Sequence, residues 1–355
     1  MNYSGPDLSQ QWAALLEAEP QLRIRDAAHC LGVSEAELLA TRCGQGVVRL
    51  AGGWNDMVKE FPRLGRVMCL TRNDHAVHER YGVFEAVSFF GPTQGMGQVV
   101  GRDIDLRLFM THWHSGFAVE EPDKKGERRR SFQFFDKYGT ALHKVYIQPE
   151  SEPGVYEALL GAYRSPDQTT KERVEAAQPE TAAEKPDEEV DVEGFQTEWL
   201  ALSDTHQFFI LLKKHGLSRV QALRLAPEGY AWEVEADAAR PLLEEASGVG
   251  LPIMVFIGSP GCVQIHTGPV SKIAMFGDEW LNVLDPDFQM HLRQSAVTSA
   301  WIVRKPTQSG VVTSLELFDA EGGNVALFFG VRDEAGEEDP RWISLVQSLK
   351  SKEGQ

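Results

Sequence analysis

The chain has 355 residues, which exceeds the usual size of a single domain, so we expect two domains. With 42% hydrophobic and 25% charged residues, its composition is ordinary for a globular protein. Its formal net charge of −17 argues against nucleic acid and against anionic membrane surfaces as main partners, because both require a basic footprint. No signal-peptide pattern and no apolar run of ~20 residues is present, and the four cysteines lack disulfide or C-x-x-C spacing. We therefore expect a cytoplasmic protein without membrane insertion.

The N-terminal residues 7–42 are expected to be helical. Residues 26–31 and 34–41 flank Gly32, and Ser34 and Glu37 have the spacing of a capping box. The pair resembles a helix-turn-helix, but Glu35 and Glu37 stand where a DNA-reading helix would carry lysine or arginine. We expect no nucleic-acid partner.

Between residues 67 and 147 the pattern changes to short β-type runs at 67–70, 76–81, 84–90, 106–119, 130–135 and 141–147. Turn residues separate them, as at Asn73-Asp74, Gly91-Pro92, 122–126 and Tyr138-Gly139. Strands in series joined by short turns give an antiparallel sheet. Within these runs, we expect Asp105 to point away from Arg107 and not to pair with it.

Residues 165–193 have a different composition, rich in Glu, Pro, Thr and Ala and without apolar periodicity. Ten acidic and three basic residues give this segment a net charge of −7. Such a segment buries too little apolar surface to fold by itself, so we interpret it as a flexible acidic linker. It separates an N-terminal part, residues 1–164, from a C-terminal part, residues 194–355.

The C-terminal part repeats the N-terminal part at an offset of 183 to 186 residues. The matching segments are 32–34 with 216–218, 67–68 with 253–254, 104–108 with 288–292 and 134–136 with 317–319. This pattern predicts an α+β protein with a tandem duplication of a helical segment followed by a large antiparallel sheet. The copies differ at two positions of chemical interest, because His206 corresponds to Leu22 and Arg107 corresponds to His291.

Residues 202–216 are predicted to form one short helix in the C-terminal repeat. Ser203 or Asp204 can cap its start, and Gly216 can end it. The apolar residues with helical spacing, which mark the buried face, are Phe208, Leu211, Leu212 and Leu217. His206 lies in the first turn, where the positive end of the helix dipole favours the neutral imidazole that a metal ligand requires.

Several segments together resemble a known family. They are Ser203-Asp204-Thr205-His206-Gln207-Phe208-Phe209, Lys213-Lys214-His215-Gly216-Leu217-Ser218-Arg219, the run 252–265, Trp301-Ile302-Val303-Arg304-Lys305-Pro306 and Thr313-Ser314-Leu315-Glu316-Leu317-Phe318. The chain is similar in these segments to the bacterial cytoplasmic hemin-transport or hemin-degrading proteins of haem-uptake operons. The resemblance covers nearly the whole chain, both repeats included, and leaves out the acidic linker.

This resemblance implies two large antiparallel sheets stacked at the centre, with helices at the sides and haem bound on the C-terminal half. His206 would be the axial ligand of the haem iron, and Arg107 would act on the other face of the haem, as a catalytic residue if the protein is an enzyme. The expected contacts at the propionate edge are basic, namely Arg219, Lys305 and Arg332. Many relatives have a tyrosine where this chain has Phe329, so the polar contact at that edge is missing or replaced.

The resemblance leaves two functions open. In the first, the protein accepts haem delivered through an inner-membrane haem importer and passes it to a downstream haem oxygenase. In the second, it is an enzyme that opens the porphyrin ring and releases iron with an external reductant, since no flavin or nicotinamide motif is present. A protein-interaction scaffold without haem binding is a third reading, against which the histidine and the arginine argue.

The other histidines have simpler interpretations. His112 and His114 alternate on one strand and resemble half of a metal site, but no third ligand is evident and we expect surface or packing roles. His75 and His78 are candidates for a second haem contact, and His291 is expected to be structural or a secondary ligand.

Overall fold

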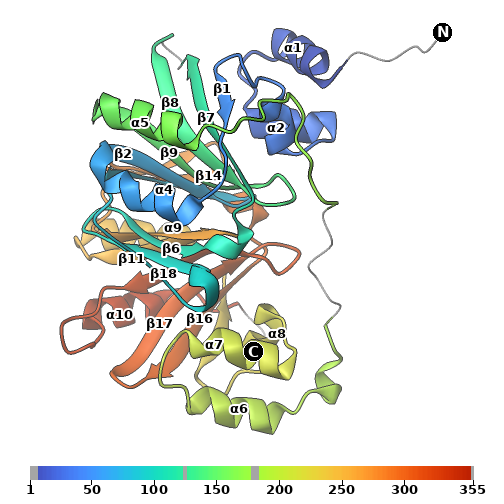
Figure 1. Ribbon diagram of the computed structural model, residues 1–355. Coiled ribbons are helices and arrows are strands. Elements are labelled where there is room, and N and C mark those ends of the chain that lie inside the picture. Colours follow the sequence, from blue (N-terminus) through green and yellow to red (C-terminus); the bar gives the residue numbers. More distant parts are fainter. Residues whose placement is uncertain (1–6, 123–125, 177–183, 353–355) are drawn as a thin grey trace. The chain divides into compact units, whose positions relative to one another are not determined.

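We describe a computed structural model of the chain over residues 7–122, 126–176 and 184–352 (Figure 1). The centres of the predicted linker and of the predicted turn at 122–126 lie outside the described residues. The chain divides into two compact units, and each is described by itself. Unit 1 comprises Met1–Arg72, Glu79–Gln178 and Gly258–Gln264, and unit 2 comprises Asn73–His78, Pro179–Ile257 and Ile265–Gln355. No helix in the described ranges is long and apolar enough to cross a bilayer.

The helices of unit 1 include the predicted N-terminal pair. They are α1 (Leu8–Ala18), α2 (Ile24–Leu31), α3 (Glu35–Ala40), α4 (Trp54–Glu60) and α5 (Pro153–Tyr163), with the 3₁₀ helices η1 (Phe61–Leu64), η2 (Pro92–Gln94) and η3 (Met110–His112). The capping box is confirmed, because the Ser34 hydroxyl accepts the Glu37 N–H at 3.2 Å and the Glu37 carboxylate accepts the Ser34 N–H at 2.9 Å. Gly32 ends α2 with a positive φ of 66°.

The strands of unit 1 form two antiparallel runs. One run has the order β1 (Val47–Arg49), β7 (Ser115–Pro122), β8 (Arg128–Phe135), β9 (Ala141–Ser151) and β2 (Gly65–Arg72). The other has the order β4 (Ala86–Phe90), β5 (Met96–Val100) and β6 (Asp105–Phe109). The core of unit 1 contains large aromatic side chains, including Phe61, Phe84, Phe132 and Phe134.

The prediction of one strand over residues 106–119 is wrong, because η3 separates β6 from β7. The backbone turns there so that Met110 and Trp113 are both buried, and the Trp113 Nε1–H donates to the carbonyl of Gly261 at 2.9 Å. Both His112 and His114 are exposed, as expected for surface residues. Two-residue alternation cannot be carried through a helical turn, so these histidines do not share a strand face.

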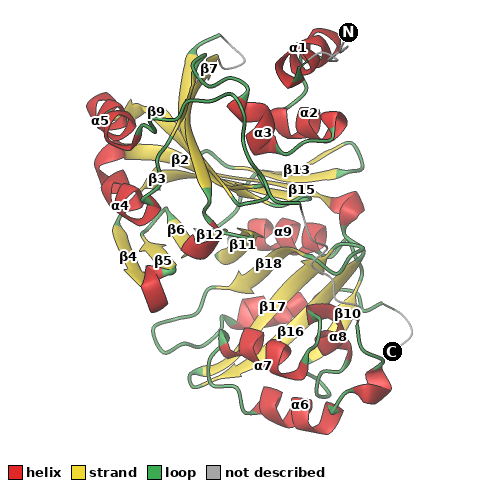
Figure 2. Ribbon diagram, turned by 45° about the vertical axis from the view of Figure 1, so that its right-hand side comes forward, coloured by secondary structure: helices red, strands yellow, loops and turns green. Residues whose placement is uncertain are grey.

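Unit 2 has the helices α6 (Val192–Leu200), α7 (Gln207–His215), α8 (Arg219–Arg224), α9 (Ala239–Gly248) and α10 (Pro340–Ser348), with η4 (Asp187–Glu189) and η5 (Gln294–Ala296). One antiparallel run has the order β10 (Ala231–Val234), β16 (Ser299–Thr307), β17 (Gly310–Phe318), β18 (Asn324–Gly330) and β11 (Ile253–Ser259). The second has the order β13 (Ile273–Phe276), β14 (Trp280–Leu284) and β15 (Phe288–Arg293). The helices α6, α7 and α8 lie together beside β16 and β17 (Figure 2).

Three strands, β3 (Ala76–Val83), β11 and β12 (Cys262–Gly268), contain residues of both units. Within the described residues, all strands belong to two nine-stranded sheets. The predicted α+β class with large antiparallel sheets is therefore confirmed.

Strand register in the two units agrees with the predicted repeat. In unit 1, the cross-strand row through β2, β9, β8 and β7 consists of Met68, Tyr146, Ser131 and Val119. In unit 2, the row through β11, β18, β17 and β16 consists of Met254, Phe329, Ser314 and Val303. Gly32 and Gly216 have nearly the same backbone angles and are followed by serine caps in both units.

The segment predicted as a linker makes defined contacts on either side of residues 177–183. Towards unit 1, the Gln168 amide exchanges hydrogen bonds of 3.0 Å with the backbone of Arg49, and Glu172 pairs with the Arg49 guanidinium. Towards unit 2, Arg224 on α8 pairs with Glu184 and Asp187, each at 3.1 Å. The low apolar content of the segment 165–193 does not prevent these contacts, because they are made by charged and amide groups.

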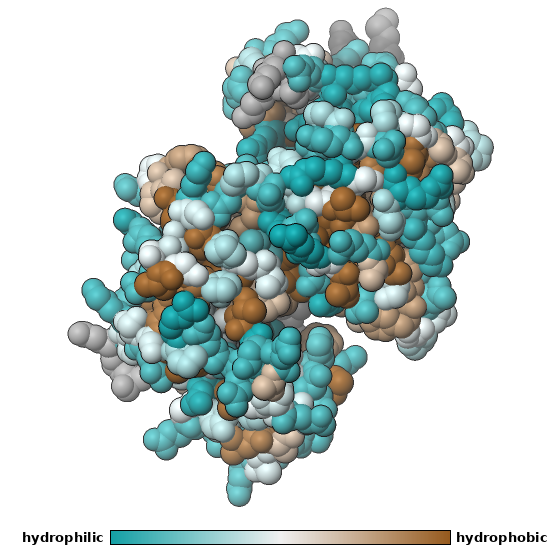
Figure 3. Space-filling model, turned by 90° about the vertical axis from the view of Figure 1, so that its left-hand side faces the viewer, coloured by the Kyte–Doolittle hydropathy of each residue, from teal (hydrophilic) through white to brown (hydrophobic). Residues whose placement is uncertain are grey.

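Most large apolar residues are buried in the described chain, and hydrophilic side chains dominate the face seen in Figure 3. Scattered apolar residues on such a face are normal for the surface of a folded protein. Two apolar side chains on α7 are largely exposed, since Phe209 and Ile210 are 71% and 66% exposed.

Candidate functional site

Helix α7 carries His206 at its N-cap position, one residue before the first helical residue Gln207. The prediction that Ser203 or Asp204 caps this helix is wrong, because His206 is the N-cap residue and makes no side-chain cap hydrogen bond. Residues 203–206 instead form a turn in which the Asp204 carboxylate accepts the His206 N–H at 2.7 Å. Gly216 ends the helix with a positive φ of 65°, as predicted.

The imidazole of His206 is oriented by the same carboxylate. Its Nδ1 lies 2.6 Å from Oδ1 of Asp204. Because a carboxylate only accepts hydrogen bonds, the neutral ring carries its proton on Nδ1 and keeps the lone pair of Nε2 free. Hydrogen bonds from the backbone N–H and the ring of His206 lower the pKa of Asp204, so this acceptor stays ionised. The His206 side chain is 87% exposed, so Nε2 is open to a ligand.

The exposed face of α7 combines this imidazole with apolar surface. Phe209 and Ile210 follow His206 at three and four residues, so the three side chains share one face of the helix. The predicted buried residues Phe208, Leu211, Leu212 and Leu217 are buried; the first three occupy the opposite face of α7, and Leu217 follows the glycine that ends the helix. An imidazole flanked by two uncovered apolar side chains can bind a flat apolar ligand that carries a metal ion.

Beside the helices, the sheet of unit 2 presents a partly exposed apolar row. Phe329 on β18 lies opposite Met254 on β11, and Leu327 lies opposite Phe256. All four side chains are half-buried, and the rings of Phe256 and Phe329 are 4.8 Å apart. Phe329 thus has apolar neighbours on its own sheet face.

Two of the predicted basic residues meet on one buried carboxylate, that of Glu316 on β17. Arg219 donates to it through Nε at 2.7 Å and through Nη2 at 2.9 Å, and Lys305 donates through Nζ at 2.6 Å. Glu316 and Lys305 are buried, while 28% of the Arg219 side chain remains exposed. Two positive charges and one negative charge leave this group with a surplus of one positive charge.

Burial and the neighbouring charges act differently on the pKa of each of these three residues. Burial alone would raise the pKa of Glu316, but Arg219 and Lys305 hold it well below its usual range. Burial lowers the pKa of Lys305 to about 8, although Glu316 opposes this shift. Burial also acts against the charge of Arg219, but Glu316 outweighs it and raises the pKa of that guanidinium.

Arg332 lies apart from this group, on the exposed segment after β18. Its Nη1 donates to the Ser309 hydroxyl at 3.3 Å, and its backbone forms a bridge with Glu338. Its charge also contributes to the lowered pKa of Asp204, after the hydrogen bonds from His206. This contribution connects Arg332 electrostatically with the turn that carries the imidazole.

Arg107 belongs to unit 1, on β6. It is half-exposed and lies opposite Gln98 on β5, next to a row that consists of Phe90, Met96 and Phe109. The expectation that Asp105 points away from Arg107 is wrong, because Nη1 of Arg107 donates to the Asp105 carboxylate. Residues two apart on a strand share one face, which accounts for this ion pair.

The sequence matches the family model described as "Haemin-degrading HemS.ChuX domain" twice, over residues 32–163 and 216–349. The chain is 37% identical over 347 residues to the hemin transport protein HmuS of Yersinia pestis, covering 98% of each chain. Its structure matches holo-PhuS, described as a heme-binding protein from Pseudomonas aeruginosa, with a TM-score of 0.93, 42% identity and coverage of 97% and 99%. It matches ChuS, described as an E. coli heme oxygenase, with a TM-score of 0.86, 36% identity and coverage of 97% and 99%.

This chain belongs to the HemS/ChuX family. The two model matches correspond to the two repeats and leave out the segment between them. The first match ends at residue 163. The second begins at Gly216, the glycine that terminates α7.

Four other histidines of this HemS/ChuX chain, namely His75, His78, His266 and His291, have protein neighbours. His291 on β15 has its Nδ1 at 2.6 Å from the Asn282 amide oxygen, and His78 and His266 are buried against the ring of Phe288. His75 lies 3.8 Å from Asp319. Among the described residues, no group of three or more His, Cys, Asp or Glu side chains could hold a metal ion.

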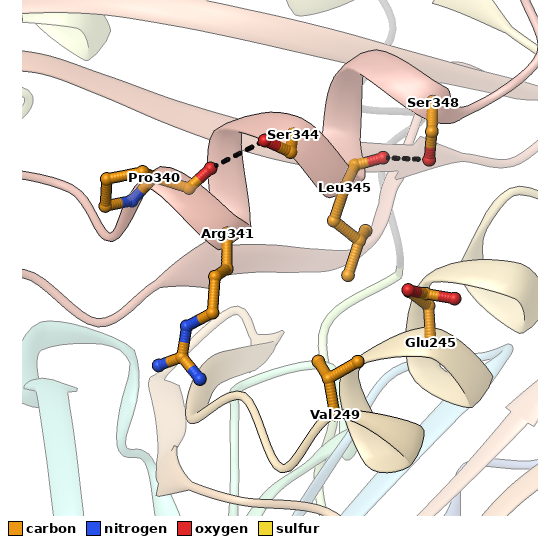
Figure 4. A pocket seen from close by; sticks show the side chains of 7 residues that line it. All are labelled: Glu245, Val249, Pro340, Arg341, Ser344, Leu345 and Ser348. Carbon is orange, nitrogen blue, oxygen red and sulfur yellow. Dashed lines mark hydrogen bonds between the residues drawn. The ribbon is translucent and has the colours of Figure 1, made fainter.

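A surface groove of about 390 Å³ lies between α9 and α10 of unit 2 (Figure 4). Its lining consists of Glu245 and Val249 from α9, and of Pro340, Arg341, Ser344, Leu345 and Ser348 from α10. None of the predicted site residues lines this groove, and it offers no imidazole.

Sequence reasoning missed Glu316 and the exposed pair Phe209 and Ile210. A signal for each was present. Glu316 is a single acidic residue inside an apolar strand sequence, and Phe209 and Ile210 are apolar residues outside the buried spacing of their helix. A charge in a buried strand predicts a buried counter-charge, and a second apolar face on a helix predicts a binding surface.

Proposed function

We propose that this chain binds haem on unit 2, with Nε2 of His206 as the axial ligand of the iron. The observation that carries the proposal is the exposed face of α7. It presents an imidazole with a free lone pair, oriented by a carboxylate, beside two uncovered apolar side chains. Haem is a flat apolar plate whose iron accepts such a nitrogen.

The charges of unit 2 fit the two propionates of haem. Arg219 has exposed surface and belongs to a group with one surplus positive charge, and Arg332 is exposed near the turn that carries His206. We assign the propionate contacts to these two residues, with Lys305 acting from its buried position beside Glu316. Phe329, which cannot donate a hydrogen bond, contributes apolar surface.

Within this proposal, the protein is a cytoplasmic carrier that accepts imported haem and passes it to a haem oxygenase. The family membership and the similarity to proteins described as hemin transport proteins support this role. The solvent exposure of the ligand face also supports it, because a haem that is bound at the surface can be transferred to an acceptor.

Ring opening is the second candidate function. It is favoured by the 36% identity to a protein described as a heme oxygenase and by the half-exposed guanidinium of Arg107, which can donate hydrogen bonds to an anionic sixth ligand. The reaction would require an external reductant and would release iron.

An absorption titration of the purified protein with hemin tests the proposal. We expect a saturable Soret band at one equivalent, and a large loss of affinity in His206→Ala. A wild-type protein without a Soret shift would refute haem binding, and an unchanged His206→Ala titration would refute the assigned ligand. Adding reductant in air with catalase then separates the functions, because decay of the band with iron release indicates an enzyme, and stable haem that moves to an added oxygenase indicates a carrier.

A further inference from the structure

The carboxylate of Glu316 connects three elements of unit 2. It is fully buried on β17 and accepts hydrogen bonds from Arg219 at the start of α8, from Lys305 on β16 and from the Ser314 hydroxyl at 3.1 Å. An unpaired charge at this depth would be strongly unfavourable, so the carboxylate and its two cations depend on one another.

Both cations also contact helix α7. Nζ of Lys305 lies 4.6 Å from the centre of the Phe208 ring, and Cζ of Arg219 lies 5.5 Å from it. The same ring packs against Trp199 in a T-shaped arrangement, with the two ring centres 4.7 Å apart. Phe208 is two residues after His206, in the first turn of α7. The position of this turn therefore depends on where the two cations are held.

We propose that Glu316 is a positioning residue for the haem ligand, because it holds Lys305 and Arg219 against Phe208 and thereby fixes the first turn of α7 with the His206 imidazole. This inference rests on the proposed function. Without Glu316 the two cations repel each other, and the ring of Phe208 loses its cation–π contacts.

The N-terminal repeat provides an internal comparison. Its residue at the position of Glu316 is Gln133, which lies opposite Lys144 just as Glu316 lies opposite Leu327. Lys144 pairs there with Glu35 on α3, and both are buried. Unit 1 thus has a buried ion pair of the same kind without a histidine at the position of His206, so it supplies a matched control.

Hydrogen exchange of the haem-free protein tests the first half of the proposal. In Glu316→Gln, which keeps the shape of the side chain, we expect the amides of α7 to exchange roughly tenfold faster relative to those of α9 in the same unit. The control Glu35→Gln breaks the ion pair of unit 1 and is expected to leave the exchange of α7 unchanged. Equal exchange of α7 in Glu316→Gln and in the wild type would overturn the proposal.

Hemin titrations across pH test the second half. The charged groups that face Lys305 are Glu316 on β17 and Arg219 on α8, while α7 contributes the uncharged Phe208. Loss of Glu316 removes the charge that stabilises protonated Lys305, so the pH at which haem affinity falls should move downward in Glu316→Gln. Glu316→Asp retains the charge and is expected to keep the wild-type midpoint. A downward shift in Glu316→Asp as large as that in Glu316→Gln would contradict the assigned role.

If Glu316→Gln does not fold, the double variant Lys305→Met with Glu316→Gln replaces it, because it removes a buried cation together with the anion. Arg219 then remains partly solvated. We expect this variant to fold and to show the same faster exchange of α7, and wild-type exchange there would overturn the proposal. Failure of the wild type to bind hemin would refute the proposed function alone, since the exchange experiment requires no haem.

Discussion

Nδ1 of His206 and Oδ1 of Asp204 are 2.6 Å apart, and the same carboxylate oxygen accepts the backbone N–H of His206 at 2.7 Å. One exposed aspartate therefore fixes both the backbone and the ring of the proposed ligand. Hydrogen bonds of this kind set the tautomer of a metal-binding histidine and increase its basicity.

Asp204→Ala should lower haem affinity by about 10- to 100-fold, because the imidazole loses its orientation and its preferred tautomer. The stability of the haem-free protein should change by no more than about 0.5 kcal/mol, since Asp204 is exposed. Hemin titration and urea unfolding measure the two effects. Glu198→Ala is the control, because Glu198 pairs with Lys214 near the other end of α7. Equal affinity in Asp204→Ala and Glu198→Ala would contradict the prediction.

Replacing both Phe209 and Ile210 by serine should weaken haem binding by about 2 kcal/mol or more, because haem would no longer cover apolar surface there. The haem-free protein should not lose stability, since both side chains are already exposed to water. Phe276→Ser offers a control, as Phe276 is 56% exposed on β13 of the same unit. If the two α7 substitutions affect haem affinity no more than Phe276→Ser, the apolar face of α7 is not the haem surface.

Arg107→Ala should alter the absorption and spin state of bound ferric haem while changing its affinity less than about tenfold. The reason is that we assign Arg107 a hydrogen bond to the sixth ligand of the iron and no bond to the iron itself. The measurement is a spectrum with and without added azide. Arg102→Ala, an exposed arginine of the same unit, should leave the spectrum unchanged. Complete loss of binding in Arg107→Ala would show that our division of roles is wrong.

The free energy of unfolding should decrease in mild acid because His143 takes up a proton when the chain unfolds. Burial lowers the pKa of His143 to about 3, and its Nδ1 lies 2.9 Å from the Thr71 hydroxyl. Since the unfolded chain binds this proton near pH 6.5 and the folded chain does not, the free energy of unfolding decreases by about 1.4 kcal/mol per pH unit below pH 6.5 from this group.

Urea unfolding at pH 8, 6, 5 and 4 measures this slope. His143→Gln removes the titrating group and should make the fall between pH 6 and pH 4 shallower by about that amount per unit. A loss of unfolding free energy that comes from the altered packing of the core appears equally at pH 8 and does not change the slope. Parallel curves for variant and wild type would contradict the assignment.

The elements that the sequence predicts best are those with local signals. Ser34 with Glu37, Gly32 and Gly216 act within one or two turns of chain, and their roles are confirmed. The break between β6 and β7 was not predictable in this way, because it depends on Trp113 donating to Gly261, 148 residues away. The apolar alternation does change phase at the break, from Leu106, Leu108 and Met110 at even positions to Trp113, Phe117 and Val119 at odd positions, but a change of phase alone does not specify a helical turn.

The candidate site likewise combines features with a local sequence signal and contacts between residues far apart in the sequence. His206 follows from a motif and a resemblance, whereas the pairing of Arg219 and Lys305 with Glu316 joins residues up to 97 positions apart. Asp105 and Arg107 could have been paired correctly, since strand geometry places residues two apart on one face.

The buried ion pairs of the two repeats have opposite polarity. In unit 1 the helix α3 supplies the anion, Glu35, and the strand β9 supplies the cation, Lys144, whereas in unit 2 the helix α8 supplies the cation, Arg219, and the strand β17 supplies the anion, Glu316. During folding, a chain with two similar halves can pair the helix of one with the sheet of the other. Such a mispaired product would bury Arg219 against Lys144 without Glu316, or Glu35 against Glu316 with Lys305 as the one cation beside two carboxylates, and the surplus of like charge disfavours both. The divergence of the repeats thus directs each helix to its own sheet.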